Sequence, residues 1–133
     1  MKASVYHVQL NVRDAGVSLP FYRALLDYLD YRVSYEEPGV LGMSNGTTDF
    51  WLIGTPADRR RHAPHRKNPG LNHVAWRVTS RADVDRFYEE FLKSRGIPAL
   101  YGGPREYREY RPGYYAVFFE DPDRLKLEVV HIP

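Results

Sequence analysis

The chain has 133 residues, the usual size of one domain, and 43% apolar with 27% charged residues is the composition of an ordinary folded protein. It has no cysteine, which excludes disulfides, thiolate zinc sites and cysteine nucleophiles, so a metal would have to be held by His, Asp, Glu or water. The formal net charge of +2 is too small to indicate a nucleic acid partner. Because no apolar run reaches signal-peptide length or the ~20 residues of a membrane span, we expect a cytoplasmic protein with no membrane partner.

The first predicted elements are a strand and a helix. Residues 5–12 alternate between apolar and polar side chains, as in a strand with one face on a core, and His7 falls on the polar face. Asp14 is a candidate N-cap for the helix that follows, and Pro20 suits its first turn. The stripe predicted to face the core has helical spacing and consists of Val17, Phe21, Leu25 and Tyr28, flanked by Ala24 and Leu29.

Three further strands complete this first set of elements. They are predicted over residues 31–35, 40–44 and 50–53, with turn signals at Pro38-Gly39 and Asn45-Gly46 between them. The order is therefore strand, helix, three strands.

The second half of the chain repeats that order. Its first strand is predicted over 72–78 and its helix over 82–95, with an inner face of Val84, Phe87, Tyr88, Phe91 and Leu92 and with Gly96 as the stop. The remaining strands are predicted at 97–100, 114–120 and 125–130, with an Asp121-Pro122-Asp123 turn before the last.

The two halves form an internal repeat. His7 opens the first copy, and His73 opens the second copy 66 residues later. Each βαβββ copy exposes one half-covered sheet, so packing the copies against each other would bury both. We therefore predict an α+β fold in which two βαβββ modules form an open, barrel-like mixed sheet with helices outside. The whole chain is expected to be one domain, with module one at 1–55, a linker at 56–70 and module two at 71–133.

Three side chains could meet at one metal. On the last strand Glu128 faces away from the apolar row, as His7 and His73 do on theirs. If the two sheets curve into one cleft, two imidazoles and a carboxylate would form an open site for a divalent metal such as iron, manganese, nickel or zinc. Water or substrate could take the remaining positions.

Nearly the whole chain resembles the vicinal oxygen chelate superfamily of glyoxalase I, extradiol dioxygenases, fosfomycin-resistance thiol transferases and bleomycin-binding proteins. The segments that carry the resemblance are Tyr6-His7-Val8, 21–26, 71–76, Phe87-Tyr88, 113–123 and 127–129. The resemblance implies paired βαβββ modules around a metal that binds substrate through adjacent oxygens, with ligands at His7, His73 and Glu128. It also implies a homodimer.

The chain departs from the glyoxalase I pattern where the first copy should supply a fourth ligand. Aligning Leu52 with Leu127 puts Ile53 opposite Glu128, and a slip of two residues puts Trp51 there; neither side chain can bind a metal. Asp49 has the right strand parity but lies four residues from the aligned position. This pattern favours a three-ligand site and leaves a metal-free binding protein possible.

Other segments offer weaker candidates. Residues 101–113 form an insertion of tyrosines and arginines with glycines near each end, which suits either a mobile flap that contacts an aromatic or anionic substrate or a solvated loop with local ion pairs. Tyr115, beside the predicted cleft, is the candidate catalytic acid or oxyanion hydrogen-bond donor, with a structural tyrosine as the alternative. The basic linker, with His62 and His65, could bind an anion or nucleic acid but suits a flexible charged connector better.

Two functions follow. The first is a metal-dependent lyase or dioxygenase of this superfamily that acts on a small, oxygenated, aromatic or anionic metabolite. The second is a non-catalytic binding protein, similar to bleomycin-resistance proteins, that holds such a molecule with Trp51, Trp76 and Tyr115. A shared fold does not choose between the two.

Overall fold

The computed structural model describes residues 1–61 and 65–133. The chain divides into two compact units, Met1–Ala63 and Pro64–Pro133, and one predicted module falls in each. Whether the units form one domain stays a prediction. No helix within the described residues is long and apolar enough to span a membrane.

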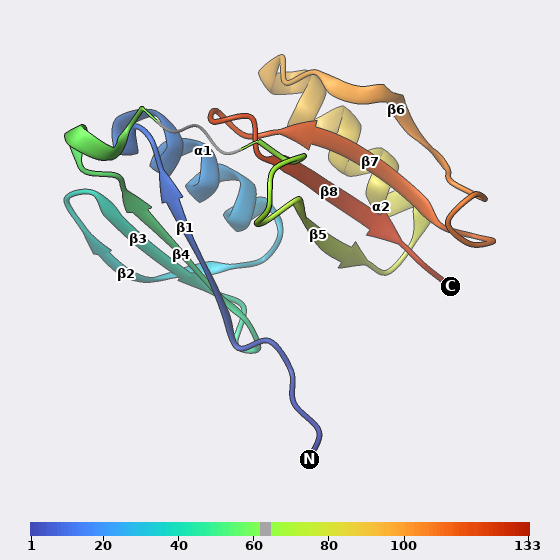
Figure 1. Ribbon diagram of the computed structural model, residues 1–133. Helices are drawn as coiled ribbons and strands as arrows, with labels where there is room; N and C mark the ends of the chain where they lie inside the picture. Colours follow the sequence, from blue (N-terminus) through green and yellow to red (C-terminus); the bar gives the residue numbers. More distant parts are fainter. Residues whose placement is uncertain (62–64) are drawn as a thin grey trace. The chain divides into compact units, whose positions relative to one another are not determined.

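Unit 1 is one βαβββ module, as the sequence predicted. Its four strands form a single open sheet in the order β1-β4-β3-β2, in which β1 runs parallel to β4 and the other neighbours are antiparallel. Helix α1 packs on one face of this sheet (Figure 1). The elements are β1 (His7–Val12), α1 (Ala15–Tyr28), β2 (Arg32–Glu37), β3 (Val40–Ser44) and β4 (Asp49–Gly54), followed by the short 3₁₀ helix η1 (Ala57–Arg59).

Helix α1 buries a face one residue away from the predicted one. Tyr22, Leu25 and Leu26 are fully buried, whereas Val17 is 55% exposed and Phe21 only half-buried. The prediction was wrong in phase because apolar residues flank both sides of the stripe, so that their spacing alone allowed two adjacent faces.

The start of α1 was predicted in part. Asp14 is the N-cap, and its carboxylate accepts a hydrogen bond of 2.9 Å from the backbone N–H of Gly16. Pro20, however, lies inside the helix and beyond its first turn, because the cap at Asp14 starts the helix at Ala15.

Unit 2 has the same topology. Its open sheet has the order β5-β8-β7-β6, with β5 parallel to β8, and α2 packs on one face (Figure 1). The elements are β5 (His73–Val78), α2 (Arg81–Arg86), the π-helical turn η2 (Phe87–Leu92), the 3₁₀ turn η3 (Lys93–Arg95), β6 (Ala99–Glu106), β7 (Tyr115–Glu120) and β8 (Lys126–His131). The fold is therefore α+β with two βαβββ modules.

The helical segment of unit 2 matches its prediction closely. Val84, Phe87, Phe91 and Leu92 are fully buried, and Gly96 ends the segment in the left-handed conformation at φ 64°. The π turn brings Phe87 and Phe91 into a stack with ring centroids 5.2 Å apart. Only Tyr88 of the predicted inner face is less than fully buried.

The predicted insertion at 101–113 is not a simple loop. Strand β6 runs through its first half, where positive φ angles at Gly102 and Gly103 accompany a shift in the register between β6 and β7. Tyr107 is only 2% exposed and packs in a small core with Phe118 and Val130. The prediction of a flap or a solvated loop was wrong at Tyr107, whose aromatic ring is buried although its neighbours in the sequence are charged.

Candidate metal site

Strand register places the predicted ligands of unit 2 on the sheet face that α2 leaves uncovered. Glu128 is paired with Ala75 of β5 and with Phe118 of β7, and His73 is paired with Lys126. Residues paired in this way project from the same face of a sheet. His73 and Glu128 therefore share a face, as the sequence predicted.

Glu128 is buried and makes two close contacts. Its Oε1 accepts a hydrogen bond of 2.5 Å from the Tyr114 hydroxyl. Its Oε2 lies 3.2 Å from Nε2 of His73, and the side chains of Glu128 and His73 are 1% and 35% exposed. Oε2 nevertheless has no hydrogen-bond partner among the described residues, so the short distance to His73 lacks hydrogen-bond geometry.

The other nitrogen of His73 is also held. Nδ1 lies 2.7 Å from the side-chain oxygen of Asn72, and the amide nitrogen of Asn72 donates a 2.8 Å hydrogen bond to the backbone carbonyl of Arg66. Because the amide nitrogen is used in this way, its oxygen faces the ring and accepts from Nδ1. In the neutral ring this leaves the lone pair on Nε2, the ring nitrogen that lies 3.2 Å from Oε2 of Glu128.

A lone pair on Nε2 and the unpaired Oε2 suit a shared cation. Ligand atoms that bind one divalent metal at about 2.1 Å each lie about 2.9–3.4 Å apart, a range that includes the observed 3.2 Å. A buried carboxylate oxygen without a donor also costs free energy, which a bound cation would remove. The two residues thus fit a divalent metal.

Burial affects the charges at this site. It raises the pKa of the Glu128 carboxyl, opposed by the hydrogen bond from Tyr114 and the proximity of His73 and Lys126. Burial, together with the hydrogen bond to Glu128, also raises the pKa of Tyr114 far above its ordinary value. The Tyr114 hydroxyl therefore keeps its proton and acts as a donor to the carboxylate.

Aromatic and cationic side chains surround the pair. The Lys126 ammonium lies 4.5 Å from the ring centroid of Phe118 and 5.5 Å from that of Tyr101. Tyr110 stacks on Tyr107 with centroids 5.6 Å apart and meets Tyr114 edge-on. An aromatic or anionic molecule would find suitable partners on this face.

His7 occupies the equivalent position in unit 1 but has different neighbours. It is exposed on β1, and its register partner on β4 is Asp49, so the two side chains share the face that α1 leaves uncovered. The position equivalent to Glu128 is held by Trp51, which is paired with Gln9 as Glu128 is with Ala75. The register thus selects Trp51, and not Ile53, as the counterpart of Glu128.

Two other candidates lie on the helix-covered side of unit 2. The Tyr115 hydroxyl donates a 2.7 Å hydrogen bond to Asp85 on α2, and burial followed by this bond raises its pKa to about 12. Strand parity places Tyr115 with Val117, on the opposite face from Glu128. The catalytic role predicted for Tyr115 stays a prediction, but Tyr114 is the tyrosine that contacts Glu128. Trp76 is 8% exposed and paired with Val129 on that covered side, so it does not share the face of Glu128, and its predicted role in binding stays a prediction.

His65 and His131 have partners elsewhere in unit 2. His65 begins a turn of unit 2, where its Nδ1 accepts from the Lys67 backbone, and Nδ1 of His131 lies 3.4 Å from the Val78 carbonyl. His62 falls outside the described residues. Within residues 1–61 or within 65–133, no three His, Asp or Glu side chains gather as a metal site. Of the three predicted ligands, the structure brings His73 and Glu128 together in unit 2.

Known proteins resemble this chain in sequence and in fold. The family model of the glyoxalase, bleomycin resistance protein and dioxygenase superfamily matches residues 4–129. The chain belongs to this superfamily. It is 35% identical to the uncharacterized protein YqjT of Bacillus subtilis, over 95% of this chain and 97% of that protein.

Solved structures of the superfamily share the fold. The crystal structure of a candidate glyoxalase from Bacillus halodurans is 34% identical, covers 96% of this chain and 95% of its own, and superposes with a TM-score of 0.83. A lactoylglutathione lyase from Agrobacterium tumefaciens covers 98% and 94% with a TM-score of 0.71, and at 21% identity it supports the fold alone.

Sequence reasoning missed Asn72 and Tyr114. Both are adjacent to residues that it selected, His73 and Tyr115. The parity of Tyr114 with Glu128 across the last turn was readable in the sequence, whereas the contact of Asn72 with its own neighbour depends on a side-chain rotamer.

Proposed function

We propose that this protein is a divalent-metal-dependent enzyme of the superfamily, with the metal held by His7, His73 and Glu128, that acts on a small oxygenated metabolite. The observation that carries the proposal is the buried Oε2 of Glu128, which lacks a donor and lies 3.2 Å from Nε2 of His73. The strand position of His7, equivalent to that of His73, and its exposed imidazole support it as the third ligand.

Such a metal supplies Lewis-acid polarisation of substrate oxygens when it is bound. The neighbouring side chains would position the ligands and the substrate. Tyr114 holds the Glu128 carboxylate in place through the bond to Oε1, and Asn72 orients His73. The ammonium of Lys126, on the same face, would attract an anionic group of the substrate.

The experiment is metal analysis of protein purified without chelators. We expect about one equivalent of a divalent metal per chain, lost in a His7→Ala/His73→Ala variant and retained in His131→Ala, a control on the strand of Glu128 but on its other face. A content far below one equivalent that the double variant leaves unchanged would reject the metalloenzyme. Oxygen consumption with catechols would favour a dioxygenase over a lyase.

A metal-free binding protein is the second candidate, supported by the aromatic surface of unit 1. Trp51 packs flat against Gly42, where a Cβ atom would come within 2.9 Å of its ring, and the Tyr35 ring lies 5.6 Å from it by centroids. Both aromatic rings remain partly exposed to a ligand. Tight binding of an aromatic compound, unchanged in the His7→Ala/His73→Ala variant, would favour this candidate.

As the resemblance implies, we also propose that the protein is a homodimer.

A further inference from the structure

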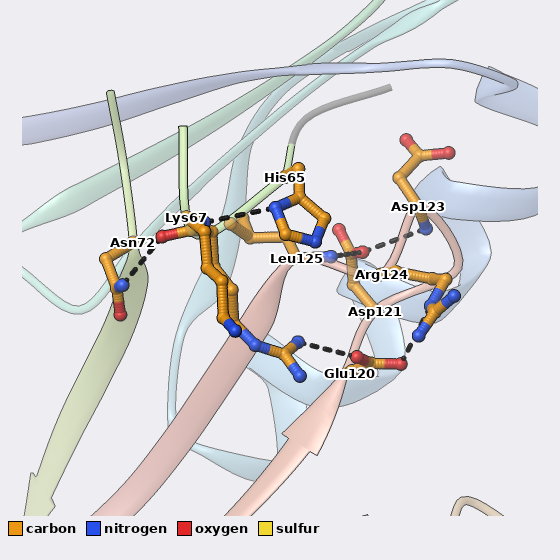
Figure 2. A network of polar contacts seen from close by, with 9 residues as sticks. His65, Lys67, Asn72, Glu120, Asp121, Asp123, Arg124 and Leu125 are labelled. Carbon is orange, nitrogen blue, oxygen red and sulfur yellow. Dashed lines mark hydrogen bonds and ion pairs between the residues drawn. The ribbon is translucent and has the colours of Figure 1, made fainter. Parts of the chain in front are cut away.

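The segment between the modules is held firmly at its unit 2 end. His65 to Asn68 form a turn, closed by a 2.8 Å bond from the Asn68 N–H to the His65 carbonyl. The guanidinium of Arg66 donates a 2.7 Å hydrogen bond to Glu120 at the end of β7, and both side chains are largely buried, at 28% and 21% exposed. Figure 2 shows the contacts made by Glu120 and by Asn72, and the one between Lys67 and His65. A segment expected to be a plain charged connector is thus tied to the sheet.

Asn72 joins this segment to the candidate metal ligand. Its amide nitrogen donates 2.8 Å to the carbonyl of Arg66, which Figure 2 also draws, and its oxygen lies 2.7 Å from Nδ1 of His73. The contacts form a continuous series from Glu120 through Arg66 and Asn72 to His73. The carbonyl of Arg66 accepts from the amide nitrogen of Asn72, and this turns the amide oxygen of Asn72 toward the His73 ring.

We infer that Asn72 is a positioning residue that keeps the hydrogen of the neutral His73 ring on Nδ1 and leaves Nε2 free for a metal, and that Arg66 holds Asn72 in that orientation. The inference rests on the proposed function in one respect, that His73 binds metal. The placement of the ring hydrogen is a property of the metal-free protein and is measurable by itself.

A hydrogen-bond partner of a metal-binding histidine controls which ring nitrogen carries the hydrogen. A ring nitrogen binds metal through its lone pair, so the other nitrogen must carry the hydrogen, and a hydrogen-bond acceptor at that nitrogen favours this tautomer and fixes the plane of the ring. In solution the Nε2–H form competes, and a ring in that form would present a hydrogen to the metal. Asn72 removes this competition before any metal arrives.

The experiment is nitrogen NMR of the imidazole rings in metal-free protein at about pH 8, above the ordinary histidine pKa of ~6.5. His73→Gln assigns the signals. We expect the Nδ1–H tautomer in the wild type and a substantial Nε2–H population in Asn72→Ala. Asn72→Asp keeps an acceptor beside Nδ1 and should retain Nδ1–H. Asn68→Ala is the matched control, since it replaces another exposed asparagine of the same segment.

Affinity for Zn²⁺ and for Mn²⁺, measured with a competing chelator, provides the second measurement. We expect Asn72→Ala to weaken binding by about 10–100-fold, the usual cost of losing an outer partner of a ligand. Arg66→Met should weaken it less, because the backbone carbonyl remains, and Asn68→Ala should not change it.

The outcomes separate this inference from the proposed function. An Nε2–H tautomer in the wild type, or identical ring signals in Asn72→Ala and Asn68→Ala, would overturn the inference. A tautomer change in Asn72→Ala in a protein that binds neither metal would support the positioning role while rejecting the metal-dependent function.

Discussion

The two units have the same topology but carry different side chains at equivalent positions. In both, a histidine opens the first strand, and the strand paired in parallel with it carries a residue two positions beyond the partner of that histidine. In unit 2 that residue is Glu128, with Tyr114 on one oxygen and His73 near the other. In unit 1 it is Trp51, which lies against Gly42. The repeat therefore gives both units an equivalent position for a metal ligand. Glu128 at that position in unit 2 can bind a metal, whereas Trp51 in unit 1 cannot.

The largest expected effect tests whether the units unfold together. Leu25 and Phe91 lie at equivalent helix positions and are both fully buried, so replacing either by alanine should cost about 2–5 kcal/mol. If the chain is one domain, both substitutions lower the same unfolding transition. The two tryptophans, Trp51 and Trp76, allow each unit to be followed by fluorescence in single-tryptophan variants.

Coincident denaturant transitions at both tryptophans, in Leu25→Ala and Phe91→Ala alike, would establish the single domain. Separate transitions, with each substitution lowering only the transition of its own unit, would contradict it.

The second prediction concerns the residues that differ between the units. Glu128→Gln keeps the shape of the side chain and an acceptor for Tyr114 but removes the negative charge, so affinity for a divalent metal should fall by at least about 100-fold, beyond the usual cost of losing an outer partner. Trp51→Phe, at the equivalent position, should leave it unchanged. Isothermal titration with Mn²⁺ measures both, and equal affinities for the two variants would remove Glu128 from the site.

The third prediction separates two adjacent tyrosines. Tyr114→Phe removes the donor to Glu128 and should weaken metal binding about tenfold, as expected of an outer hydrogen bond. Tyr115→Phe removes only the bond to Asp85 on α2 and should cost about 1 kcal/mol of stability with no loss of metal affinity. The reverse result, with Tyr115→Phe alone affecting metal binding, would contradict the role of Tyr114 as the residue that holds Glu128.

The smallest effect tests what the units share. Asp14 and Ser80 are the N-caps of α1 and α2, each accepting a hydrogen bond from a backbone N–H in the first turn. Replacing either by alanine should lower the free energy of unfolding by about 1 kcal/mol, without affecting metal affinity. Chemical denaturation of both variants measures this, and a metal-binding defect in Asp14→Ala would show that the caps do more than start helices.

Much of the fold was predictable because it depends on short-range patterns. Alternation identified the strands, and Asp14 and Gly96 marked one helix start and one helix end correctly. The phase of α1 was missed because two adjacent faces were both apolar. The course of β6 was missed because a glycine bulge and a buried tyrosine, Tyr107, override the polarity of the surrounding residues.

The site was predictable to the level of strand parity and no further. Parity placed His73 and Glu128 on one face, and the structure brings them together. It could not show that Glu128 is buried, nor that Tyr114 and Asn72 hold the pair, because those contacts depend on how the 107–114 segment and individual rotamers settle. The part of His7 in the same site remains a prediction from the repeat.

We propose that a metal binds between His73 and Glu128, with His7 as the third ligand. The most direct measurement is anomalous scattering from crystals grown with Mn²⁺, with data collected on both sides of the metal absorption edge. We predict an anomalous peak within about 2.0–2.3 Å of Nε2 of His73, a carboxylate oxygen of Glu128 and a ring nitrogen of His7. Ordered His73 and Glu128 side chains with no peak between them would show that this pair does not bind a metal.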